Sequence, residues 1–288
     1  MTDIRRRDLL LAAAAARFSA AVSKLRAASR ARIQVGVTDW DLRLTARVEA
    51  VAMARRIGFD GVEVSLGNKP KDGRLPQDDP EIIQRYRAAA AEHQLTLAST
   101  CLDALHNFHL KSDPLAPKLL ADAIRVTAAL GARVILLPSF GKAAPAEPAE
   151  QERVAALLKE HVGAASSAGI TLCLENDLSA EINARILELC PSPALKVYYD
   201  TGNSFNRGYD VLKEIRFLGR ERIGQVHFKD GKSYLGEGKI DFNAVAQALN
   251  DIGYQGFIVL ETPSPSGDIE ADMRRNLAFV RRLFQTAA

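Results

Sequence analysis

Four side chains that can bind metal interrupt short apolar runs in the second half of the chain. They are Glu175 after Leu-Cys-Leu, Asp200 after Val-Tyr-Tyr, His227 within Val-His-Phe and Glu261 after Ile-Val-Leu. A buried carboxylate is costly unless it is paired, hydrogen-bonded or bound to a cation. Three carboxylates beside one imidazole would repel one another unless a divalent ion lay between them, so this set predicts a metal site.

Carboxylate oxygens and an imidazole nitrogen are typical ligands of hard or borderline divalent ions. We therefore expect one divalent metal ion as cofactor, manganese by preference, with magnesium, cobalt or zinc as alternatives. Because no cysteine belongs to the set and positions remain for water or substrate, a catalytic site is favoured over a structural one. Such an ion could hold a carbonyl oxygen and an adjacent hydroxyl, and stabilise the enediolate formed when the neighbouring carbon loses its proton.

The elements that must position these side chains repeat one pattern after residue 32. An apolar run is followed by a polar loop, a stretch of helical periodicity and often a glycine. Apolar runs of this kind are typical of parallel strands buried on both faces. Eight such units predict an α/β fold, a single closed (β/α)8 TIM barrel over residues 33–288, whose active sites lie where the strands end. The predicted strands are 33–38, 61–66, 95–100, 133–138, 170–175, 195–200, 223–228 and 256–261.

Local signals support this reading. Asp79 followed by proline predicts the start of a helix. Glycines 58, 131, 169 and 253 stand just before strands, where a helix ends in the left-handed conformation. A doubly wound sheet is less favoured, because no Gly-x-Gly-x-x-Gly follows the first strand.

The first 32 residues differ in charge from the rest. They hold eight of the 38 Lys and Arg and two of the 35 Asp and Glu residues, so 30 basic and 33 acidic residues remain for the body. This mildly acidic body gives no electrostatic reason to bind nucleic acid. Arg6-Arg7-Asp8-Leu9-Leu10 and the apolar run after it follow the twin-arginine pattern. Residues 1–32 therefore predict an export signal of a periplasmic protein, or otherwise a helical arm on a cytoplasmic one.

Two further classes of feature are missing from the sequence. No later run reaches the roughly 18 apolar residues that cross a bilayer. The cysteines, Cys101, Cys173 and Cys190, have no close spacing. We therefore expect no membrane span and no disulfide framework.

The strand endings Leu-Glu-Asn, Asp-Thr-Gly-Asn, His-Phe-Lys-Asp and Leu-Glu-Thr resemble those of the sugar phosphate isomerase/epimerase family. This family of xylose isomerase-like TIM barrels includes tagatose and psicose 3-epimerases and inosose dehydratase. The loop Gly236-Glu237-Gly238 resembles the family's Gly-Glu-Gly loop. The resemblance spans roughly residues 33–284. It implies that Glu175, Asp200, His227 and Glu261 are metal ligands and that the two glutamates are the acid/base pair.

Other polar side chains near the strand ends are expected to serve the substrate. We predict Lys229 as a third catalytic group, which polarises or orients the substrate. Asn203 stands where several epimerases of the family have a histidine, and Ser233 where they have an arginine, so ketohexose specificity is not implied. The predicted substrate-binding residues are Trp40, Glu63, His106, Glu181, Asn203 and Asp230.

We therefore expect a metal-dependent isomerase or epimerase of a keto sugar or related polyol, acting on a small molecule and able to form a homodimer or higher oligomer. One alternative is a metal-dependent lyase or hydratase acting on a 3-keto sugar or inosose. Another is a non-catalytic barrel that binds sugar. The endonuclease IV branch of the superfamily is disfavoured, because its three-zinc cluster needs many histidines and the chain has five.

Overall fold

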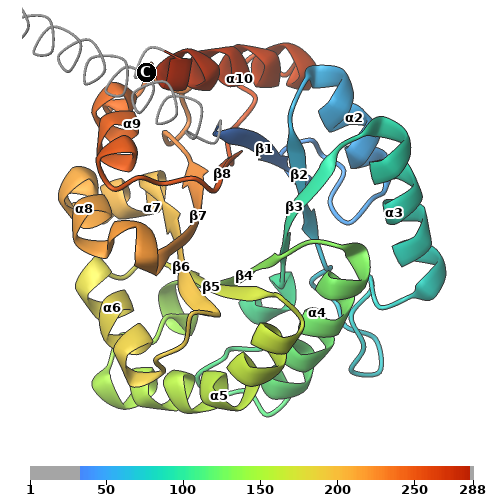
Figure 1. Cartoon of the computed structure of the whole chain (residues 1–288), viewed down its shortest axis with the longest axis vertical. Helices are drawn as coiled ribbons and strands as arrows, with labels where there is room; N and C mark the ends of the chain where they lie inside the picture. The colour runs from blue at the N-terminus through green and yellow to red at the C-terminus, as the bar shows by residue number, and fades with distance from the viewer. Residues whose placement is uncertain (1–32, 286–288) are drawn as a thin grey trace, which may run out of the picture.

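Eight parallel strands close into a barrel, and helices surround it (Figure 1). The computed structural model describes residues 33–285. Strands follow their sequence order around the barrel, and β1 pairs with β8 to close it. The strands are β1 (Gln34–Thr38), β2 (Gly61–Ser65), β3 (Thr96–Cys101), β4 (Val134–Ser139), β5 (Thr171–Asn176), β6 (Leu195–Asp200), β7 (Ile223–Phe228) and β8 (Phe257–Leu260). The predicted barrel is confirmed, and each strand boundary lies within one residue of its prediction.

Some helices between the strands begin or end at residues that the sequence indicated. Asp79 caps a helix by accepting hydrogen bonds from the backbone amides of Glu81 and Ile82. Gly58 and Gly131 end helices at φ of 110° and 88°. The α-helices are α2 (Glu49–Ile57), α3 (Pro80–His93), α4 (Ala116–Leu130), α5 (Pro148–Ser167), α6 (Ala180–Leu189), α7 (Thr201–Asn206), α8 (Val211–Arg222), α9 (Phe242–Asp251) and α10 (Ile269–Gln285), with short 3-10 turns η1 (Asp103–His106) and η2 (Gly141–Ala143).

The apolar interior has two parts. The larger lies between the strands and the surrounding helices. A small separate cluster contains Cys101, Leu136, Cys173 and Tyr198. All three cysteines are buried and free, so the expectation of no disulfide framework is confirmed for the described residues.

Two further predictions concern membranes and export. None of the described helices is both long and apolar enough to cross a membrane. The predicted export signal or helical arm at 1–32 lies outside the described residues.

Candidate active site

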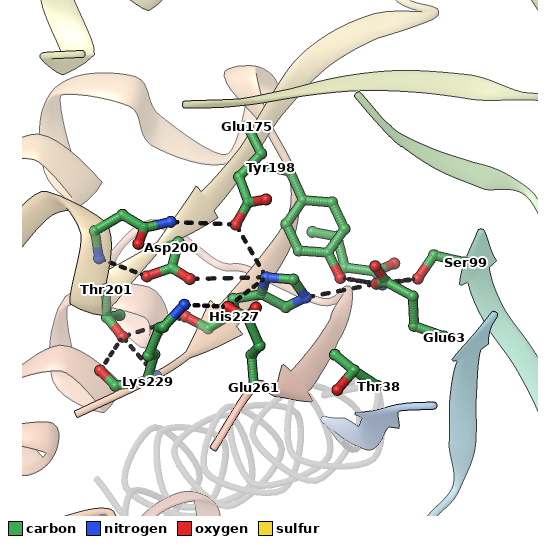
Figure 2. Close-up of polar contacts among 12 residues, drawn as sticks. Thr38, Glu63, Ser99, Glu175, Tyr198, Asp200, Thr201, His227, Lys229 and Glu261 are labelled. Atoms are coloured by element: carbon green, nitrogen blue, oxygen red, sulfur yellow. Dashed lines mark hydrogen bonds and ion pairs between the residues drawn. The ribbon is translucent and has the colours of Figure 1, made fainter. Parts of the chain in front are cut away.

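The four predicted metal ligands lie together where β5, β6, β7 and β8 end (Figure 2). The Nδ1 atom of His227 is 3.0 Å from Glu175 Oε1, 3.7 Å from Asp200 Oδ2 and 3.7 Å from Glu261 Oε2. One ligand atom from each residue lies within 4.8 Å of all the others. Glu175, Asp200 and His227 are buried and Glu261 is half-buried. The barrel thus gathers three carboxylates and one imidazole around a single point.

This set fits a divalent ion. Asp200 Oδ2 is buried with no hydrogen-bond partner, whereas Oδ1 accepts a hydrogen bond of 2.7 Å from the backbone amide of Asn203. An orphaned carboxylate oxygen costs free energy unless something positive meets it. Because it belongs to a group of oxygen and nitrogen donors, a hard or borderline cation is the partner that suits it.

Charge in the cluster is unevenly compensated. Burial raises the pKa of Asp200 well above its ordinary range, and the carboxylates of Glu261 and Glu175 raise it further. Burial also raises the pKa of Glu175, against the influence of His227. For His227 burial opposes protonation, but Glu175 and Glu63 outweigh it and hold its pKa well above the usual value. Positive charge is therefore favoured at this point, as a bound proton or as a cation.

Helix α7 fixes two of these side chains. Asp200 ends β6 and is also the N-cap of α7, so the same carboxylate faces the cluster and terminates the helix. Thr201 Oγ1 contacts the carbonyl of His227 and accepts a hydrogen bond from the backbone amide of Lys229 at 3.1 Å. The side chain of Asn203 donates to Glu175 Oε1 at 3.5 Å. These bonds tie α7 to β5 and β7, and place Asn203, a predicted substrate-binding residue, at the cluster.

Glu261 receives a donor on each oxygen. Lys229 Nζ lies 2.7 Å from Oε2, and Trp40 Nε1 donates to Oε1 at 3.2 Å. Burial would raise the pKa of Glu261, but His227 and Lys229 together lower it. The structure therefore brings Lys229, predicted as a catalytic group, and Trp40, predicted to bind substrate, to the carboxylate of Glu261. His227 and Lys229 favour the ionised form of that carboxylate.

Two predicted substrate-binding residues, Glu63 and Asp230, are buried and contact other parts of the protein. Glu63 on β2 has no exposed surface, and its carboxylate lies 3.6 Å from His227 Nε2, on the side of the ring away from the other carboxylates. Asp230 is 5% exposed and accepts hydrogen bonds from the backbone amides of Gly238, Lys239 and Ile240. Asp230 therefore holds the Gly-Glu-Gly loop in place, and Glu63 lies beside the imidazole of His227.

Two others lie away from the cluster. Glu181 is in the first turn of α6, where its own backbone amide and Ser179 lower its pKa. Its carboxylate serves there as an N-terminal helix charge. His106 ends η1 after β3, and its ring stacks on Phe140 with centroids 6.0 Å apart. The structure brings neither side chain into the metal-ligand cluster.

Two side chains of this region were not expected from the sequence. The ring of Tyr198 on β6 lies 4.4 Å from that of His227, and its hydroxyl donates to Glu63. Asp41 follows β1 and accepts a hydrogen bond of 2.8 Å from Thr38 Oγ1. Burial, aided by Glu261, raises the pKa of Asp41 to about 7. Asp41 could have been found from the sequence, because it directly follows the predicted pocket residue Trp40. Tyr198 could not, because the sequence does not show which of the adjacent residues Tyr198 and Tyr199 faces the site.

Comparison with known proteins identifies relatives of this arrangement. A model of the family described as xylose isomerase-like TIM barrel matches residues 51–283. The chain is 30% identical over 199 residues to the 2-epi-5-epi-valiolone 7-phosphate 2-epimerase of Actinoplanes sp., with 69% of this chain and 73% of the relative covered. It is also 30% identical over 243 residues to an L-ribulose-5-phosphate 3-epimerase of Salmonella typhi, with 77% and 84% covered.

A solved structure has the same fold. The D-psicose 3-epimerase of Clostridium cellulolyticum H10, determined with D-tagatose, superposes with a TM-score of 0.75. The match covers 88% of this chain and 99% of that one, at 20% sequence identity.

Proposed function

Because the chain belongs to the xylose isomerase-like TIM barrel family, we propose that it is a divalent-metal-dependent epimerase of a keto sugar or a related polyhydroxylated ketone. That it is an enzyme follows from its relatives, which are sugar epimerases. The observation that carries the proposal is the convergence of Glu175, Asp200, His227 and Glu261 on one point at the barrel mouth. Manganese is the ion that we expect there.

The two glutamates would move the proton. When bound, the ion supplies positive charge that polarises the substrate carbonyl and its adjacent hydroxyl. Glu175 on β5 and Glu261 after β8 approach the cluster from strands separated by β6 and β7. A glutamate that uses one oxygen as a ligand keeps the other for a proton. One glutamate can therefore remove the proton from the carbon beside the carbonyl while the other returns it to the opposite face.

Lys229 and Trp40 would help to set which of the two glutamates is ionised before the reaction begins. Both donate hydrogen bonds to Glu261, and Lys229 together with His227 favours its carboxylate form. Burial raises the pKa of Glu175, so this glutamate holds a proton more readily. Opposed environments of this kind assign one carboxylate as base and the other as acid. We therefore propose Glu261 as the first base and Glu175 as the group that returns the proton.

Hydrogen exchange with solvent tests the proposal. Purified protein with added Mn²⁺ is incubated in heavy water with free and 5-phosphorylated ketopentoses, ketohexoses and a 3-keto glucoside. We expect deuterium at a single carbon next to the carbonyl, together with the epimer, by NMR. Absence of exchange with every compound and with Mn²⁺, Mg²⁺ and Co²⁺ would overturn the proposal. A product that has lost water would assign a lyase instead.

Matched variants show whether the two glutamates do the chemistry. Glu175→Gln and Glu261→Gln keep the side-chain shape and remove the proton acceptor. Each is expected to reduce kcat by about 10²–10⁴-fold, the usual contribution of a general acid or base. Metal content is measured on the same samples, because both residues are also ligands. Wild-type turnover in metal-loaded Glu261→Gln protein would contradict the role of Glu261.

A further inference from the structure

The two ring nitrogens of His227 face different surroundings. Nδ1 faces the carboxylates of the metal-ligand cluster, and Nε2 faces Glu63 Oε2 at 3.6 Å. Figure 2 shows Glu63 on the opposite side of the imidazole from Glu175 and Asp200. Both side chains have no exposed surface, and both His227 Nε2 and Glu63 Oε1 are buried without a hydrogen-bond partner. Two unpaired polar atoms thus belong to neighbouring side chains where water does not reach.

Glu63 is held in this position by a chain of donors from other strands. Ser99 Oγ on β3 donates to Glu63 Oε2 at 2.6 Å, and the Tyr198 hydroxyl donates to the same oxygen. Gln225 Nε2 on β7 in turn donates to Ser99 Oγ at 2.8 Å and to the Tyr198 hydroxyl at 2.9 Å. Because both hydroxyl protons are directed at Glu63, its carboxylate is held in one orientation.

We infer that Glu63 is a positioning residue for the metal-binding histidine: it accepts the Nε2–H proton of His227 and so presents the Nδ1 lone pair to the ion. The inference rests on the proposed metal site. A shift of about 0.5 Å would bring the 3.6 Å separation to hydrogen-bond length. A carboxylate behind a metal-bound imidazole fixes its tautomer and ring orientation and increases its basicity. The tilted contact of Tyr198 holds the ring plane at the same time.

Metal affinity of substituted proteins tests this role without reference to catalysis. Glu63→Leu removes the acceptor, and its Kd for Mn²⁺, measured from the free-ion EPR signal, is expected to rise about 10–100-fold. Glu63→Gln keeps a neutral acceptor and should recover part of the loss. Thr100→Val is the matched control, because it removes a buried hydroxyl from the same region of β3, where Thr100 bonds to Thr127 at 2.6 Å and not to Glu63. The Co²⁺ absorption spectrum should change in Glu63→Leu and remain close to the wild type in Thr100→Val.

The outcomes separate this inference from the proposed function. Wild-type Mn²⁺ affinity in Glu63→Leu, or in Glu63→Gln should the leucine variant not fold, would overturn the inference and leave the epimerase proposal intact. An equal loss in Thr100→Val and Glu63→Leu would overturn it too, because general disturbance of the barrel interior would then be the cause. If the wild-type protein binds none of the divalent ions, both the inference about Glu63 and the proposed metal-dependent function are overturned.

Discussion

At the scale of single residues, protons and a divalent cation would compete for the same atoms of the site. Burial and neighbouring carboxylates raise the pKa of Asp200, and Glu175 and Glu63 hold that of His227 high although burial opposes it. His227 therefore holds its proton more tightly than a free imidazole until something else supplies positive charge. A divalent ion needs the same Nδ1 lone pair and the same carboxylate oxygens that these protons occupy.

This competition predicts pH-dependent metal binding. Since the pKa values of His227 and Asp200 are raised, the ion must displace protons from them, and Kd should fall as pH rises through the neutral range. Each displaced proton lowers Kd by up to about tenfold per unit rise in pH. Calorimetric titration with Mg²⁺ in buffers of different ionisation enthalpy counts the protons released. A Kd that does not change with pH would show that the cluster is already deprotonated.

At the scale of elements, the short helix α7 connects the ligand strands. It begins at Asp200 and is tied by Thr201 to the backbone of β7. Gly202 in its first turn allows this close approach. A Cβ placed on Gly202 would lie 2.8 Å from Lys229 Cγ and 3.0 Å from the Lys229 carbonyl oxygen. The element that holds Asp200 therefore depends on a residue without a side chain.

Substitution of two helical glycines tests this dependence. Gly202→Ala should destabilise the protein by about 1–3 kcal/mol, as overpacking does, and weaken metal binding by displacing Lys229 and α7. Gly163 in α5 is exposed, and a Cβ added there would meet no atom within 4 Å, so Gly163→Ala should stabilise by about 0.5–1 kcal/mol. Urea denaturation and Mn²⁺ titration measure both effects. Equal behaviour of the two variants would argue against a role for the close contact at Gly202.

At the scale of the whole molecule, the four ligands come from strands β5 to β8, which lie side by side in the closed barrel. Their Nδ1 and carboxylate atoms meet only when these strands are paired in register, as Asp200 is with His227 across β6 and β7. An ion bound there would bridge four strands and relieve repulsion among buried carboxylates. Binding is therefore coupled to folding.

We expect added Mn²⁺ to raise the melting temperature of EDTA-treated protein. At a concentration about 100 times Kd the stabilisation is roughly 2.7 kcal/mol, which corresponds to about 5–10 °C for a domain of this size. Asp200→Asn is the matched control, since asparagine still caps α7 but lacks the charge. Its melting temperature should respond little to the ion. Equal shifts in the two proteins would place the stabilising ion elsewhere.

The barrel and its four candidate metal ligands could be predicted from the sequence alone, because the sequence patterns that indicate them are local. Strands buried on both faces read as short apolar runs, and a carboxylate or imidazole at the end of such a run is conspicuous. The rule that parallel strand ends share one rim then joins Glu175, Asp200, His227 and Glu261, although they are 86 residues apart at the extremes.

Which residues face the barrel interior was decided only by the tertiary structure. Tyr198 and Tyr199 are adjacent in one apolar run, yet the first bonds to Glu63 and the second to Ser204 and Glu214. Because both faces of a barrel strand are buried, hydrophobicity does not alternate and cannot assign the direction of a side chain. From the sequence, Glu63 is therefore expected to line the pocket. In the structure, its bonds to Ser99 on β3 and Tyr198 on β6 hold it on the opposite side of the His227 ring from the other carboxylates.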